Sequence, residues 1–120
     1  MKQLLVVLAA AAALAVPAAA AAHPLGNFTI NRFARVDVAG DRLFVRYVLD
    51  LAEIPTFEAR QRGVDGRAYA ARLARGVHAT LDGRPVLLVP VAHALAFPPG
   101  AGGLHTMRFE VILRGPSVTG

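Results

Sequence analysis

Between Phe28 and Leu51 the sequence alternates apolar and polar residues, and this period of two constrains the fold more than any other feature. From Phe28 to Val38, five of the six even positions are apolar, as a strand with one buried face requires. After residues 39–41 the apolar side chains occupy the odd positions from Leu43 to Leu51. Two such strands joined by so short a turn predict an antiparallel β-hairpin.

The alternation stops after Leu51, where helical signals begin. Pro55 cannot donate to a strand ladder, so the strand is expected to end at or before Ile54. Thr56 is expected to cap a short helical turn. The alanine-rich segment from residue 67 to 75 predicts a second short helix, which ends at Gly76.

Strand patterns return in the second half of the chain. Residues 77–81 alternate and are followed by Asp82-Gly83, a strong hairpin signal. Residues 85–97 form another strand region, and residues 98–103 read as a loop. The last strand is marked by apolar residues at every second position, namely Met107, Phe109, Val111 and Leu113. The chain is therefore predicted to be mainly β, an antiparallel β-sandwich-like domain with a short helical insert.

The first 22 residues are typical of a cleaved signal peptide. Lys2 gives a positive start, residues 4–14 are a short apolar run, and three alanines precede His23. We expect residues 1–22 to be removed, residues 23–114 to form an extracytoplasmic β-rich domain, and residues 115–120 to be a linker or truncated end. An uncleaved anchor is the alternative, because residues 4–22 approach the length of about 20 residues that spans a bilayer. Alanine is only weakly apolar, so the strongly hydrophobic part of this segment is short for a membrane span, and we favour cleavage. The mature protein is then expected in the periplasm or on the extracellular face of the membrane.

Composition excludes several classes of function. Loss of the single lysine leaves 12 arginines against 8 acidic residues, and the arginines are scattered. A nucleic-acid surface would show a basic run or stripe, so no nucleic-acid partner is expected. The chain has no cysteine, hence no disulfide and no thiolate. Ser117 has no nucleophile motif around it, and no phosphate-binding glycine loop appears, so we expect neither an enzyme nor a small-molecule substrate.

Cleavage before His23 would place a free α-amine and an imidazole on one residue. An α-amine with a pKa of about 8 yields its proton readily to a competing metal, and copper(II) and nickel(II) favour such nitrogen donors. Pro24 has no N–H to join the ligands, so a second side chain from the fold is required. The candidates are three histidines and two weaker oxygen donors: His78, His93, His105, Asp50 and Glu53.

Each candidate also has an ordinary structural interpretation. A terminal His-Pro can simply begin a strand, and no HxH or HxxxH spacing accompanies it. His78 lies on the polar side of its strand, and His93 stands among apolar residues. His105 follows the glycine-rich loop and is the freest to reach a neighbour. The two acids are three positions apart, which on a strand places them on opposite faces. The predicted metal ligands are His23, His105 and His78.

Three long motifs carry a family resemblance. HPLGNFTINRFARVDV, AGDRLFVRYVLDLAEIPTFEA and GRPV…FPPGAGGLHTMRFEVIL resemble the extracytoplasmic region that precedes the membrane domain in a group of bacterial nickel/cobalt transporter-like proteins. The resemblance implies an accessory domain, or a front fragment, of a nickel or cobalt transport system, with a membrane transporter domain as partner in cis or in trans. Together with cleavage before His23, it leads to the hypothesis that this terminal histidine captures or senses the metal. No apolar run of about 20 residues follows His23, so this chain alone cannot transport an ion.

Two other classes of function stay open. The chain is also loosely similar to small periplasmic copper-resistance sandwiches whose mature chain begins with histidine. A free-standing copper-binding protein of that kind would bind Cu(II) far more tightly than Ni(II) or Co(II). The other class is a metal-free structural docking module, in which the segment DLAEIPTF packs against a membrane domain.

Overall fold

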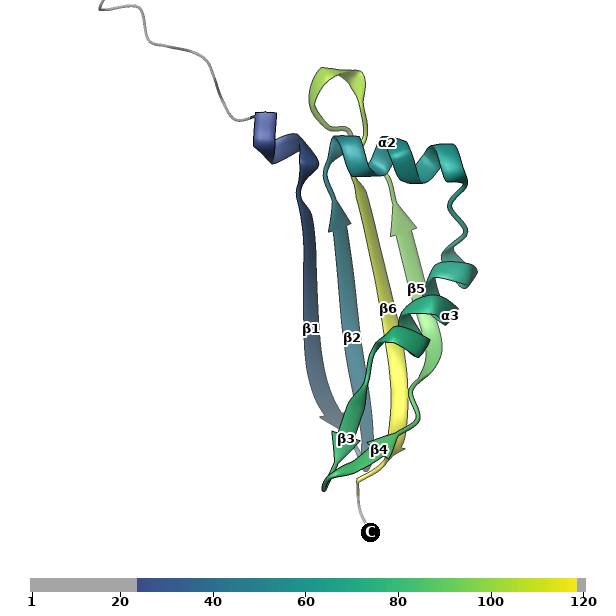
Figure 1. Ribbon diagram of the computed structural model, residues 1–120. Helices are drawn as coiled ribbons and strands as arrows, with labels where there is room; N and C mark the ends of the chain where they lie inside the picture. Colours follow the sequence, from purple (N-terminus) through teal and green to yellow (C-terminus); the bar gives the residue numbers. More distant parts are fainter. Residues whose placement is uncertain (1–23, 119–120) are drawn as a thin grey trace, which may run out of the picture.

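A four-stranded antiparallel sheet with the strand order β1-β2-β6-β5 forms the body of the molecule (Figure 1). The computed structural model describes residues 24–118. The strands of this sheet are β1 (Ile30–Ala39), β2 (Arg42–Leu51), β5 (Val89–Ala96) and β6 (Met107–Ser117). A separate two-stranded hairpin pairs β3 (Ala79–Leu81) with β4 (Arg84–Val86). The helices are η1 (Pro24–Phe28), α2 (Glu53–Arg62), α3 (Gly66–Gly76) and η2 (Ala101–Gly103).

The prediction of a mainly β fold is confirmed, as are both hairpins. β1 and β2 pair without a break from Ile30 opposite Leu51 to Ala39 opposite Arg42. The turn between β3 and β4 has positive φ at both central residues, 52° and 77°. Asp and Gly are among the residues that adopt this conformation at low cost.

The core lies between one face of the sheet and the helices. β6 contributes most to it, because Phe109, Val111 and Leu113 have no exposed surface. Ala59 of α2 and Ala70 of α3 belong to the same buried cluster, so the helices form the layer that faces the sheet. The expected β-sandwich is not confirmed. The segment between β2 and β3, rich in alanine and arginine, folds into helices and covers the apolar face where a second sheet would lie (Figure 1).

The first long helix begins earlier than the sequence suggests. α2 starts at Glu53, and Ala52 at its N-cap makes no side-chain bond. Pro55 stands in the first turn, where its missing N–H leaves no intrahelical bond unmade. Thr56 is therefore not a cap. It is 1% exposed, and its Oγ1 donates to the carbonyl oxygen of Leu51 at 3.1 Å, which ties the helix to the end of β2.

The second helix follows the prediction closely. α3 begins at Gly66 and ends at Gly76. Asp65 caps it, because its Oδ1 accepts a bond from the N–H of Ala68 at 3.0 Å. This side chain satisfies one of the donors that a helix leaves free at its start.

The end of the described chain belongs to the fold. β6 continues to Ser117, three residues beyond the boundary at 114 expected from the sequence. The N–H of Val118 donates to the carbonyl oxygen of Asp41 at 2.7 Å, and Arg42 Nη1 donates to the carbonyl oxygen of Gly115 at 3.3 Å. Residues 115–118 therefore lock the turn between β1 and β2.

The expected export signal, residues 1–22, and His23 lie outside the described residues. Across residues 24–118, no helix combines the length and the apolar character needed to cross a bilayer.

Candidate functional site

Three segments far apart in the sequence meet at one end of the sheet (Figure 1). They are residues 24–29, which contain η1, the junction between β2 and α2, and the loop formed by residues 97–106, and we call this place the motif end. The N–H of Ala52 donates to the carbonyl oxygen of Thr29 at 2.9 Å, which joins the first two segments. The N–H of Ala101 donates to Glu53 Oε1 at 2.9 Å, which joins the last two. Each segment belongs to one of the three motifs that carry the family resemblance.

Glu53 is the central side chain of the motif end. The bond from the Ala101 N–H, followed by one from its own N–H, lowers the pKa of Glu53 below its ordinary value of 4.5. A carboxylate in the first turn of a helix is also favoured by the helix dipole. A Cβ built at Gly100 would lie 2.6 Å from Glu53 Oε1, so a larger residue there would force the Glu53 side chain to move.

The loop itself closes on backbone bonds. The N–H of Gly100 donates to the carbonyl oxygen of Leu104 at 2.8 Å, and the N–H of Thr106 donates to that of Pro98 at 3.0 Å. Gly102 and Gly103 both have positive φ, 63° and 73°, which glycine adopts readily. The glycine-rich sequence thus encodes a closed loop held by Glu53.

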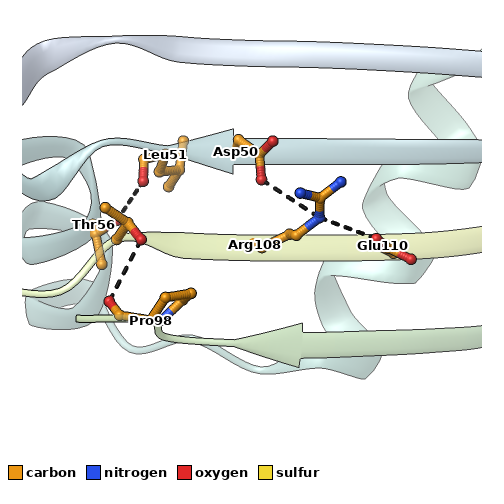
Figure 2. Close-up of polar contacts among 7 residues, drawn as sticks. Asp50, Leu51, Thr56, Pro98, Arg108 and Glu110 are labelled. Carbon is orange, nitrogen blue, oxygen red and sulfur yellow. Dashed lines mark hydrogen bonds and ion pairs between the residues drawn. The ribbon is translucent and has the colours of Figure 1, made fainter. Parts of the chain in front are cut away.

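Asp50 is engaged with an arginine at this end of the sheet. Arg108 Nε lies 3.8 Å from Asp50 Oδ1 and 3.0 Å from Glu110 Oε1 (Figure 2). Asp50 and Glu53 line the same groove of about 420 Å³, together with Gly26 of η1. The prediction that the two acids point to opposite faces of a strand does not apply, because Glu53 belongs to a helix.

His105 also lies at the motif end. It is exposed and forms an isolated bridge with Pro99. It lines a groove of about 400 Å³ between α2 and the loop, which also contains Phe57 and Arg60. The Arg60 guanidinium stands 4.9 Å from the centre of the Phe97 ring. The positive charge of Arg60 would repel a cation bound on that side of His105.

His78 lies at the opposite end of the sheet. It is exposed in the connection between α3 and β3, and it lines a groove with Leu87 and Val89 at the start of β5. His105 lies beyond the end of β5, which is eight residues long and so spans about 25 Å. His78 and His105 therefore cannot hold one metal ion together, and His23, the predicted first ligand, lies outside the described residues.

His93 has a packing role. Its ring centre lies 6.0 Å from that of Phe109, and a Cβ at Gly66 would come within 2.9 Å of its Nε2. Among residues 24–118, no group of three or more His, Cys, Asp or Glu side chains could hold a metal ion.

Two aromatic side chains are exposed in the elements of the motif end. Phe28 of η1 is 57% exposed and Phe57 of α2 is 51% exposed. The sequence pattern placed Phe28 in the buried row of the first strand, whereas it belongs to η1, and it placed Phe57 at the end of the docking segment DLAEIPTF. It did not indicate the bond between Glu53 and the loop. Only the glycines between residues 100 and 103 signal a close approach of backbone, and they do not indicate its partner.

A scan against protein-family models and searches of curated proteins and of solved structures found no match to this chain.

Proposed function

We propose that this chain is an exported, extracytoplasmic accessory domain of a nickel or cobalt transport system, with residues 1–22 as its signal peptide. In this proposal the motif end binds the metal ion and contacts a membrane transporter domain. One observation carries the proposal: the three resembling motifs, scattered over the sequence, are joined there by direct hydrogen bonds from Ala52 to Thr29 and from Ala101 to Glu53.

The position of the first described residues supports a role for His23 at this end. Pro24, the residue after His23, begins η1, and Gly26 lines the groove that contains Asp50 and Glu53. A mature N-terminus at His23 would begin three residues before Gly26, which shares this groove with the two carboxylates. The α-amine and the imidazole would supply nitrogen donors, and a carboxylate would supply oxygen, a donor set that nickel and cobalt accept.

The engagement of the two carboxylates favours a labile site. Asp50 pairs with Arg108 and Glu53 holds the loop, so a metal ion must compete with these partners for oxygen. Such a site suits capture and transfer of a metal ion to a partner better than permanent storage. His105 is the other nitrogen donor that the fold places at this end.

The test is a metal titration of the protein produced with its own leader. Mass spectrometry first establishes the mature N-terminus, and nickel, cobalt and copper are then titrated against wild type, His23→Ala, His105→Ala and His78→Ala. We expect His23→Ala to weaken nickel and cobalt binding at least tenfold and His105→Ala to weaken it less. His78→Ala is the matched control from the far end and should leave binding unchanged. Equal binding by wild type and His23→Ala, or an intact leader, would refute the metal role.

A metal-free docking module is the second candidate. The exposed Phe28 and Phe57 favour it, since exposed aromatic side chains are enriched where proteins meet. The same titration separates the candidates, because a docking module binds none of the three metals. A copper-binding protein would instead show a large preference for copper.

A further inference from the structure

β1 is a strand whose apolar side is left open. The sequence predicts a half-buried strand, yet nine of its ten residues are exposed and only Asp37 is half-buried. Ile30, Val36 and Val38 point to the same side of the sheet as the core, since they pair with Leu51, Val45 and Leu43, but they are 52%, 63% and 61% exposed. The helices that cover β2 and β6 do not cover β1 (Figure 1).

β1 also has an open edge for hydrogen bonding. In the described sheet its only neighbour is β2. The Ala52 N–H bonds to the carbonyl oxygen of Thr29, and antiparallel ladders alternate. The N–H and C=O groups of odd residues in β1 therefore face β2, and those of the even residues, Val36 among them, face away. Nothing in β1 blocks a further strand, because it contains neither proline nor a bulge.

The charges of β1 select its partner. Arg35 and Asp37 lie on either side of Val36 and form an exposed ion pair at 3.0 Å. If a second copy pairs antiparallel about a twofold axis at Val36, Arg35 of each copy stands opposite Asp37 of the other. Opposite charges in such cross-strand pairs are favourable, and like charges are not. A register centred on Arg35 would instead place two arginines face to face.

We propose that the protein forms a twofold dimer in which β1 pairs with β1 of a second copy, centred on Val36. The two sheets then become one continuous sheet with both helical layers on the same side. Val36 faces Val36, and Ala34 faces Val38 of the other copy, so the open apolar row is shared between the copies. Three residue pairs bring about six backbone hydrogen bonds. An interface of this kind is self-complementary, as a twofold dimer requires.

The register is tested by single cysteines, which are unambiguous because the chain has none. In the proposed dimer the two Val36 Cα atoms lie about 5.5 Å apart, within disulfide range. Val36→Cys should therefore form a disulfide-linked dimer on mild oxidation. Ala34→Cys and Val38→Cys are matched controls and should stay monomeric on a denaturing gel, because their equivalents lie about 14 Å apart. Crosslinking at position 34 or 38, or at none of the three positions, overturns the proposed pairing.

The partner is tested by charge reversal. Arg35→Asp makes the pair at the interface doubly acidic and Asp37→Arg makes it doubly basic, so light scattering should show each variant as a monomer and the wild type as a dimer. Mixed one to one, the two variants should form a heterodimer, detected by native mass spectrometry. The ion pair within each chain stays broken in both variants, so the rescue can arise only between chains. A wild-type monomer, or a mixture that stays monomeric, refutes the proposal.

These experiments are run in a metal chelator, and the inference does not depend on the metal function. A dimer that binds no metal would support the pairing of β1 and refute the metal function. A monomer that binds metal would do the reverse.

Discussion

At the scale of single residues, Glu53 shows how one carboxylate can organise the motif end. It contacts the loop through Ala101, stands in the first turn of α2, and lines the groove near η1. Glu53 therefore bonds the loop to the start of α2 and lies beside the groove that Gly26 of η1 also lines.

The lowered pKa of Glu53 predicts a pH dependence of stability. A carboxyl group whose pKa falls on folding stabilises the folded state above its unfolded pKa, here 4.5, and loses that contribution as the pH falls through the folded value. Glu53→Gln should therefore unfold at lower denaturant concentration than wild type at pH 7, and the difference should shrink as the pH falls below 4.5. Urea unfolding at several pH values measures it.

Glu58 provides the matched control, since it is exposed on the same helix. Glu58→Gln should change the unfolding midpoint little at pH 7. An equal, pH-independent loss in both variants would show that the bond to the loop does not act through the charge of Glu53.

At the scale of elements, the N-cap of α3 by the Asp65 side chain is the clearest local interaction. Loss of an N-cap side chain costs about 1 kcal/mol, so Asp65→Ala should lower the free energy of unfolding by about that amount. Asp65→Asn should retain most of the stability, because asparagine caps almost as well. Thermal or urea unfolding of both variants checks this, and equal losses would contradict a role for the cap.

The elements also show what the sequence could and could not predict. Periodicity located β1, β2 and β6, the Asp82-Gly83 turn and the helix that ends at Gly76, because these signals are local. It misplaced the start of α2, because threonine is a preferred helix-cap residue. The structure shows instead that Thr56 lies inside the helix and donates to the carbonyl oxygen of Leu51. It could not show that helices, and not a second sheet, cover the apolar face, because that depends on how the layers pack.

The candidate site was predicted only in part. Sequence reasoning named His105, Asp50 and Glu53, and the fold places all three at the motif end. It also named His78, which lies at the far end. Residue type is visible in a sequence, but the distance between two histidines depends on the direction of the strands between them.

At the scale of the whole molecule, residues 115–118 are part of the fold. A chain that stops at Arg114 loses the end of β6 and the bonds to Asp41 and Arg42, and we expect a loss of about 2–3 kcal/mol at about 1 kcal/mol for each hydrogen bond. Urea unfolding should show this loss, whereas a chain that stops at Val118 should match the full chain. Equal stability of both truncated chains would mean that residues 115–118 form a linker.

The position of β6 has a consequence for how the protein is made. The last strand in the sequence lies between β2 and β5, and its side chains are the most deeply buried. A nascent chain that emerges amino end first therefore cannot bond β5 into the sheet until β6 (Met107–Ser117) has emerged. Until residue 117 is available, β5 has no neighbour in the four-stranded sheet, so this sheet cannot form progressively from β1 to β5.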